Sequence, residues 1–230
     1  MKKILLAVIG IFILGSVFSQ DSFLSAIRKF NIGVGLHTDI WLGNPPGMDP
    51  RTINQGVQVN GMYNYRIKES AVNIAGGVGL GTHNLYTNTY IPDIKADSIS
   101  FLKIPDNIPY KKSKLSLAYI DIPLEFRIKT RKHFRIAFGF KVGFNINAHV
   151  KYKGNRFVVG PSGFVFAAGA IVKEKEKDVR QIETIRYGAT FRIGYKWFNL
   201  TAYYQISKVF KVDRGPALYP ISFGIAVIPF

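Results

Sequence analysis

Histidine and acidic residues are the side chains of this 230-residue chain that could perform acid–base or metal chemistry. His37 and Asp39 lie close together, and His83 and His149 lie near the ends of other extended stretches. An imidazole beside a carboxylate can act as a general base for a serine nucleophile. However, no serine occurs in a nucleophile-elbow context, and no His, Asp or Glu spacing indicates a metal site. The sequence therefore predicts no catalytic residue, no cofactor and no metal, and these histidines are interpreted as polar residues of the interior or rim.

The elements around these residues are strands, and the clearest pair runs from Ile120 to Ala148. In its first arm, 120–129, the even positions are apolar and the odd positions are mostly charged. In its second arm, 134–148, apolar even positions alternate with small or polar residues. Side chains alternate between the faces of a strand, so each arm has one continuous apolar face. The second arm keeps this pattern beyond the usual strand length and carries four phenylalanines, which favours contact with lipid.

The polar face of this pair predicts a network of charges. A three-residue turn at 130–132 would place Lys129 opposite His133, and Asp121 would then stand directly opposite Lys141. Buried charges are costly unless they are paired, so the acids of this hairpin are expected to hold the fold together and not to catalyse. The predicted structural network consists of Asp121, Glu125, Arg127, Arg135 and Lys141.

The N-terminal residues predict export. Met1, Lys2 and Lys3 form a short positive region, and an apolar run from Ile4 to Leu14 follows. This pattern is typical of a secretory signal peptide, with cleavage expected between Ser19 and Gln20. A transmembrane anchor is the weaker alternative, because the run is shorter than the roughly 20 residues that span a bilayer. The predicted organisation is a signal peptide at 1–19 and a barrel domain at 20–230, with no cysteine for a disulfide or a lipid anchor.

The rest of the chain repeats the period of two. A four-residue turn at 68–71 places Tyr63 opposite Gly76, so that an aromatic ring covers a glycine. Short and longer connections alternate, as they do in outer-membrane barrels, and aromatic residues at strand ends suit a membrane interface. The sequence predicts an all-β, eight-stranded antiparallel up-and-down transmembrane β-barrel with strands at 30–42, 53–67, 72–82, 120–129, 134–148, 185–197, 198–206 and 221–230.

Several alternatives stay open at this point. A soluble lipocalin-like barrel would turn the apolar face inward. Residues 84–113 and 151–181 are expected to be long loops, with the alternating run from Lys173 to Lys177 as a solvated part of the second. The apolar segment 157–172 could instead form an outer hairpin, a partner-binding loop or an extra strand pair, which would make ten strands. An eight-stranded lumen is only wide enough for side chains, so transport of large solutes is not expected.

The high positive net charge of the chain indicates which classes of partner to expect. The net charge is +17, and removal of Lys2 and Lys3 leaves 17 − 2 = +15. Nucleic acid is a common partner of basic chains, but export disfavours it. Anionic lipid head groups, such as lipopolysaccharide phosphates, are the expected counter-charge.

The run Tyr119 to Lys129 resembles the Tyr-x-x-Ile-Pro-Leu strand of the PorT-like small outer-membrane β-barrel family of Gram-negative bacteria. The glycine-rich strand after it, the strand with Tyr187-Gly188, the 203–207 segment and the terminal Phe230 are similar too. Phe230 departs from the pattern, because it is out of phase with the apolar face of the last strand unless Pro229 marks a bulge.

This resemblance implies a location in the cell outer membrane, insertion by the barrel-assembly machinery and no enzymatic activity. It implies outer-membrane lipids including lipopolysaccharide, the assembly machinery and other envelope or secretion proteins as partners. We therefore expect a structural or accessory membrane protein whose outer loops bind partners. A component of a surface-protein secretion apparatus is the alternative, and an outer-membrane enzyme is a third, weaker one.

Overall fold

The computed structural model describes residues 29–67, 70–130, 134–160 and 163–228, so the predicted signal peptide and Phe230 lie outside the described residues. No described helix is long and apolar enough to cross a membrane. The strands are β1 (Phe30–Leu42), β2 (Gln55–Arg66), β3 (Val72–Tyr86), β4 (Thr89–Tyr90), β5 (Leu102–Lys103), β6 (Tyr110–Lys129), β7 (Phe134–Gly160), β8 (Gly163–Lys177), β9 (Ile185–Tyr195), β10 (Phe198–Gln205) and β11 (Tyr219–Val227).

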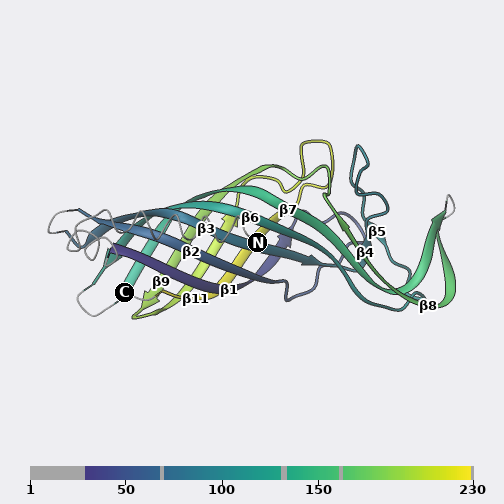
Figure 1. Cartoon of the computed structure of the whole chain (residues 1–230), viewed down its shortest axis with the longest axis horizontal. Coiled ribbons are helices and arrows are strands. Elements are labelled where there is room, and N and C mark those ends of the chain that lie inside the picture. The colour runs from purple at the N-terminus through teal and green to yellow at the C-terminus, as the bar shows by residue number, and fades with distance from the viewer. Residues whose placement is uncertain (1–28, 68–69, 131–133, 161–162, 229–230) are drawn as a thin grey trace, which may run out of the picture.

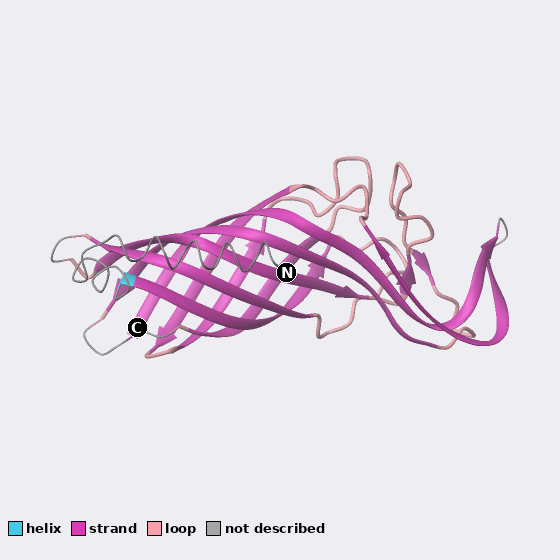
Figure 2. Ribbon diagram, viewed as in Figure 1, coloured by secondary structure: helices cyan, strands magenta, loops and turns pink. Residues whose placement is uncertain are grey.

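Eight of these strands close into an antiparallel ring in the order β1-β2-β3-β6-β7-β9-β10-β11, with β11 paired back to β1 (Figure 1). The fold class predicted from the sequence is thereby confirmed. The ten-stranded alternative is wrong, because β8 pairs within the described residues only with β7 and stays outside the ring. Figure 2 shows that the wall of the barrel is built from strands.

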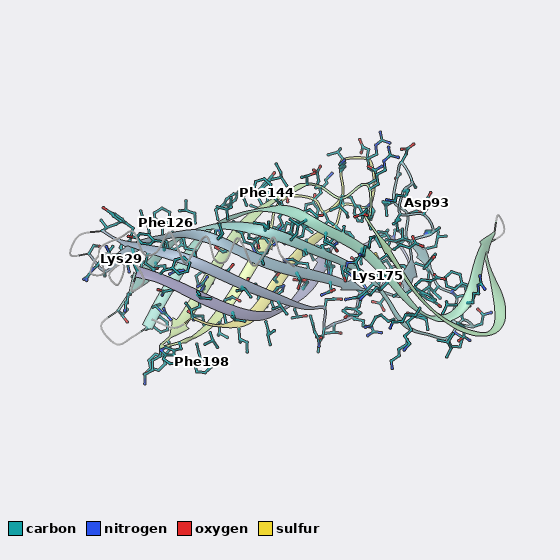
Figure 3. All side chains as sticks on the ribbon, viewed as in Figure 1. Lys29, Asp93, Phe126, Phe144, Lys175 and Phe198 are labelled. Carbon is teal, nitrogen blue, oxygen red and sulfur yellow. The ribbon has the colours of Figure 1, made fainter. Side chains whose placement is uncertain are left out.

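The apolar face of the ring points outward. Leu36 is 58% exposed, Leu124 is 50% exposed and Leu200 is 65% exposed, whereas Asp121 on the inner face is 1% exposed. Figure 3 shows such side chains projecting from the wall, with Phe126 and Phe144 among those labelled. A soluble barrel would bury these side chains, so the lipocalin-like alternative is wrong. The exposed apolar side chains form a belt that lipid can cover.

Turn length sets the register of neighbouring strands. The β2–β3 turn places Tyr63 opposite Gly76, as predicted. The β6–β7 turn is longer than the predicted 130–132, because Thr130 N–H donates to the Phe134 carbonyl at 2.9 Å. Lys129 therefore pairs with Arg135 and not with His133.

The predicted cross-strand pair changes with this register. Asp121 stands opposite Gly143, and Lys141 stands opposite Pro123, so the two charged residues are diagonal neighbours and not direct ones. The predicted direct opposition of Asp121 and Lys141 is therefore wrong, because β7 is shifted by two residues relative to β6 from the predicted register.

Long connections close the end of the barrel opposite the short turns, which we call the loop end. Trp41, Leu85 and Leu115 from the strands pack there against Ile91 and Phe210 from the connections, and all five are buried. The predicted loop at 84–113 therefore covers the mouth of the barrel. It also contains the short β4–β5 pair, while β3 and β6 extend into it at either side.

Beyond the loop end, β7 and β8 form a hairpin that projects past the barrel (Figure 1). Strand β7 pairs with β9 as far as Phe144 and with β8 from His149 onward. The prediction of an irregular region is wrong for 151–177, where the structure shows the hairpin alternative, and correct for 178–181. Residues 173–177 are exposed, as expected, but they lie on β8 and not in a loop. Aromatic contacts support the base of the hairpin, where the Tyr152 ring lies 5.1 Å from that of Phe157.

Phe138 tests the assignment of the lipid face. It is 50% exposed on β7 and stacks on Phe126 with ring centroids 5.8 Å apart. We expect Phe138→Arg to lower the free energy of unfolding in lipid vesicles by about 2–4 kcal/mol, because a guanidinium would enter hydrocarbon. The matched apolar change Phe138→Leu should cost less, and urea titration measures both. Equal costs would contradict a lipid-facing Phe138.

Candidate functional site

The centre of the lumen holds a buried cluster around Asp121. Arg186 on β9 donates to both of its carboxylate oxygens at 2.8 Å, and Lys141 Nζ lies 3.4 Å from Oδ2. Asp121 and Arg186 are each 1% exposed at the side chain. Gly143 leaves the room for this pair, since a Cβ there would collide with Asp121 Oδ1 and Arg186 Nε. The two cations thus compensate the charge of the carboxylate away from water, while Arg186 Nη1 has no hydrogen-bond partner in the described part of the chain.

A second cluster surrounds Glu125, nearer the short turns. Arg127 Nε donates to Oε2 at 2.9 Å, and Arg192 Nη2 donates to Oε1. Arg127 also donates to Asn64 Oδ1. The structure places Arg135 at the turn, where its Nη2 donates to the Lys196 carbonyl.

The predicted network residues therefore fall into three places: Asp121 with Lys141, Glu125 with Arg127, and Arg135 at the turn. Arg186 and Arg192 belong to these clusters but are absent from the network predicted from the sequence. Both face inward by alternation along β9, opposite the small residues Gly143 and Ala137 of β7. That combination of an inward cation and a small cross-strand neighbour was the signal available in the sequence.

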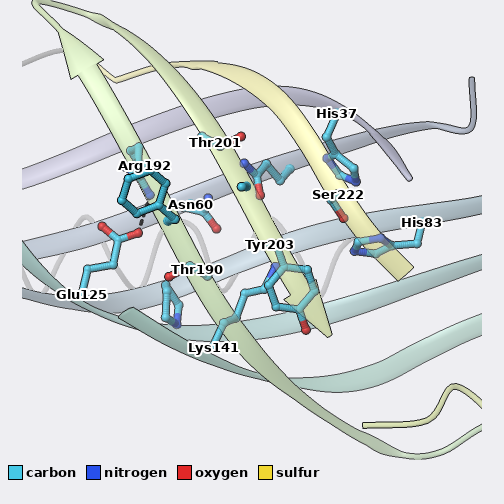
Figure 4. Close-up of a pocket in the computed structure, with 14 residues that line it drawn as sticks. His37, Asn60, His83, Glu125, Lys141, Thr190, Arg192, Thr201, Tyr203 and Ser222 are labelled. Atoms are coloured by element: carbon cyan, nitrogen blue, oxygen red, sulfur yellow. Dashed lines mark hydrogen bonds and ion pairs between the residues drawn. The ribbon is translucent and has the colours of Figure 1, made fainter. Parts of the chain in front are cut away.

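A third cluster lies between the Asp121 cluster and the loop end. His83 Nδ1 is 3.0 Å from both carboxylate oxygens of Asp39, and Ser222 Oγ donates to Asp39 Oδ1 at 2.6 Å. His37 Nε2 is 3.6 Å from Asp39 Oδ1. Figure 4 shows His37, His83 and Ser222 converging from different strands. His149 does not join them, because it bonds Asn147 on the outer side of β7.

This arrangement does not form a nucleophilic triad. A serine nucleophile must hand its proton to an imidazole, and the hydroxyl of Ser222 is hydrogen-bonded to the carboxylate. Ser222 is also 5% exposed, which leaves a substrate no approach. The cluster is a buried polar network in which Asp39 accepts from two partners, while His37 Nε2 has no hydrogen-bond partner within the described residues.

The same donors could hold a metal ion. The ligand atoms of His37, Asp39 and His83 lie within 4.8 Å of one another and form the only such group among the described residues. Cations occupy the neighbouring space, however. Lys141 Nζ lies 3.8 Å and Arg186 Cζ lies 5.5 Å from the centroid of the Tyr203 ring, which is itself 6.3 Å from the ring of His83. Repulsion from these cations opposes a divalent ion, so hydrogen bonding accounts for the cluster better than metal ligation does.

Open space in the lumen is small. The cavity shown in Figure 4, lined by residues such as His37, Glu125 and Lys141, has a volume of about 40 Å³. That volume suits one or a few water molecules and excludes larger solutes. A wider vestibule of about 440 Å³ opens at the turn end beside Arg66 and Arg135. Side chains therefore separate this vestibule from the capped loop end.

The Asp121–Arg186 pair gives a test of the network. We expect Asp121→Asn to lower the free energy of unfolding by about 3–5 kcal/mol, because two buried cations lose their counter-charge. The Asp121→Asn, Arg186→Met double variant should lose about 2 kcal/mol less than the sum of the two single changes. Pairing Asp121→Asn with Lys196→Met at the exposed turn is the control and should be additive. Additivity for both pairs would show that Asp121 and Arg186 are not coupled.

Zinc titration tests the His37–Asp39–His83 cluster. We expect one equivalent of Zn²⁺ to leave the unfolding temperature of the purified protein unchanged, because the carboxylate already has its partners and cations lie nearby. A zinc-dependent rise that disappears in His83→Asn would instead identify a metal centre.

Comparison with known proteins identifies the family. The family model described as "Outer membrane protein beta-barrel domain" matches residues 19–211, well over half of the chain. No curated protein matches the chain significantly. The structure of Ail, the attachment invasion locus protein of Yersinia pestis, in complex with the heparin analogue sucrose octasulfate is 11% identical, with a TM-score of 0.39 over 86% of this chain and 97% of that one. A triple mutant of Rhodopseudomonas blastica porin is 9% identical, with a TM-score of 0.23 over 86% of this chain and 99% of that one. On the family match, this chain belongs to the outer-membrane protein β-barrel domain family, and its location is the outer membrane.

Proposed function

We propose that this protein is a structural or accessory barrel of the outer membrane whose outer loops and β7–β8 hairpin bind partners. The observation that carries the proposal is the closed interior. Ion pairs fill the middle of the lumen, and buried residues such as Trp41 and Phe210 cap the loop end. A barrel without an open channel offers its outer surface for function, and the hairpin is the largest part of that surface beyond the belt.

The proposal includes a path to the membrane. The signal peptide at 1–19 directs export, and the barrel-assembly machinery inserts the strands. Lipids, including lipopolysaccharide, then surround the belt. The resemblance of the 119–129 strand to the PorT-like family supports this assignment, as do the short turns at one end, which are typical of the periplasmic side.

The protein is proposed not to be an enzyme. Ser222 bonds a carboxylate, the Asp39 cluster is buried, and the nearby cavity has a volume of about 40 Å³. A catalytic site needs a nucleophile in contact with its base and room for a substrate beside both. Neither condition is met in this part of the lumen.

One observation favours a role in a surface-protein secretion apparatus as a second candidate. Strand β8 pairs on one side with β7, and its other edge has no strand partner within the described residues. Such an edge can accept a strand from another protein through backbone hydrogen bonds. The hairpin would then be the contact point with a secretion partner.

A hairpin-shortened variant tests the proposal. Residues 156–170 are replaced by Asn-Gly, which favours a two-residue turn between the paired strands. We expect wild type to capture envelope proteins from detergent-solubilised outer membranes and the shortened variant to lose them, while both show the heat-modifiable mobility of a folded barrel. Co-purified secretion components would favour the second candidate.

Conductance across a planar bilayer is the complementary measurement. We expect no steady ion current through wild type or the shortened variant, because side chains block the lumen. A stable open current through wild type would contradict the closed interior, and unchanged capture by the shortened variant would contradict a binding role for the hairpin.

A further inference from the structure

Lysines face one another across three strands just beyond the barrel. Lys114 on β6 pairs with Lys151 on β7, which pairs with Lys175 on β8. In the adjacent row, Lys112 pairs with Lys153, which pairs with Lys173. Directly opposed residues of an antiparallel sheet share a face, at about 4.5–5.5 Å between Cβ atoms. We call the six residues of these two rows the lysine ladder: Lys112, Lys114, Lys151, Lys153, Lys173 and Lys175.

The ladder has no acidic partner on its own face. Within the described residues, none of its six lysines forms an ion pair with an aspartate or glutamate. Strand β8 alternates, so that Glu174 and Glu176 pair with Tyr152 and Val150, which are buried on the opposite face. The sequence of this strand is nearly neutral, but the pleat separates its charges by sign.

The lysines of the ladder repel one another. Burial, together with the neighbouring charges of Lys112, Lys151 and Lys175, lowers the pKa of Lys114 to about 8. The ammonium of Lys114 contacts neutral groups: Asn84 Oδ1 at 2.7 Å and the Tyr86 ring, whose centroid is 5.0 Å away. Like charges placed directly opposite one another destabilise a sheet, so this face is costly for the protein alone. An anion bound across the rows would remove that cost.

The ladder lies on the wall that faces lipid. The even-numbered residues of β6 share one face from Ile128 through Ile120 to Lys114; they are exposed as far as Ile120, Ser116 is buried, and Lys114 is half-buried. Lys114 stands six residues beyond Ile120, the last apolar residue of the belt on this strand. The distance from Ile120 to Lys114 is about 20 Å along the strand. At a strand tilt of about 40°, Lys114 therefore lies about 15 Å above Ile120 along the barrel axis. Figure 3 shows Lys175 near the base of the projecting hairpin.

We propose that the lysine ladder binds the phosphate groups of lipopolysaccharide in the outer leaflet. The charge complementarity is direct, since the ladder is a grid of ammonium groups and the ligand carries several phosphates on one large head group. Height decides the kind of lipid: simple head groups extend only about 5–8 Å beyond the hydrocarbon, which leaves them below the ladder. This inference rests on the proposed function for its outer orientation and assigns one face of the outer surface to a lipid.

Binding to purified lipopolysaccharide tests the proposal, with dephosphorylated lipopolysaccharide and phosphatidylglycerol as comparison ligands for the full chain in detergent. The test variant is Lys114→Gln, Lys151→Gln, Lys175→Gln. The control Lys95→Gln, Lys208→Gln, Lys211→Gln removes the same charge from other connections of the loop end. We expect the test variant to bind lipopolysaccharide at least about tenfold more weakly than wild type, and the control to stay within about twofold. Wild type should prefer the phosphorylated ligand by at least about tenfold.

Stability without ligand separates binding from a structural role. The test variant should unfold at the same temperature as wild type or higher, because repulsion within the ladder is relieved. Equal losses of binding in the test and control variants would overturn the proposal. So would equal binding of dephosphorylated lipopolysaccharide, or a response confined to a sulfated polysaccharide probe such as heparin. Capture of envelope proteins by the test variant should stay at the wild-type level, so failure here and failure of the hairpin proposal give different results.

Discussion

The structure depends on one constraint: hydrocarbon offers no hydrogen-bond partner to a peptide group. Every strand that crosses lipid must therefore pair on both sides, and the sheet must close on itself. Closure of β1 onto β11 completes the ring. It also assigns each strand one face toward lipid and one toward a lumen that eight strands leave just wide enough for side chains. The paired charges inside follow from that narrow space.

The interior changes character along its length. The middle is polar, with Asp121 and Glu125 each bound by cations from other strands, while the loop end is an apolar core built from connections folded over the mouth. Water-filled barrels keep a polar lumen throughout, but here the cap resembles the core of a soluble domain. A closed interior directs any interaction to the outside of the barrel, where the hairpin and the lysine ladder lie.

Lysines occur both in the lumen and in the lysine ladder, but only the lumen lysine has an acidic partner within the chain. Lys141 is buried and has Asp121 at 3.4 Å, so its charge is compensated within the chain. Lys114 faces Lys151 across the strands, and its charge is not compensated by any acid on that face of the described sheet. Desolvation forces pairing inside a barrel. On a surface near an anionic leaflet, the compensation can come from the membrane.

The sequence by itself determined the barrel. The period of two fixed which face meets lipid, because the pleat alternates side chains whatever the partner strand is. The lengths of the connections predicted eight strands in sequential order, and the short β2–β3 turn even fixed the opposition of Tyr63 and Gly76. Asp121 and Glu125 were recognised as network residues because their inward position followed from the same period.

Only the tertiary structure decided which residues meet across strands. The β6–β7 turn closes one step wider than predicted, which moves Lys141 to a diagonal position and separates Arg135 from Glu125. Arg186 reaches Asp121 from a strand 65 positions away in sequence, a distance over which no local pattern carries information. The lysines at 173–177 resembled a solvated loop because their charges alternate in sign. They lie on a face of positive charge because β7 pairs with β8 in place of β9 beyond the belt, which sets Lys175 opposite Lys151. The sequence alone does not specify this strand pairing.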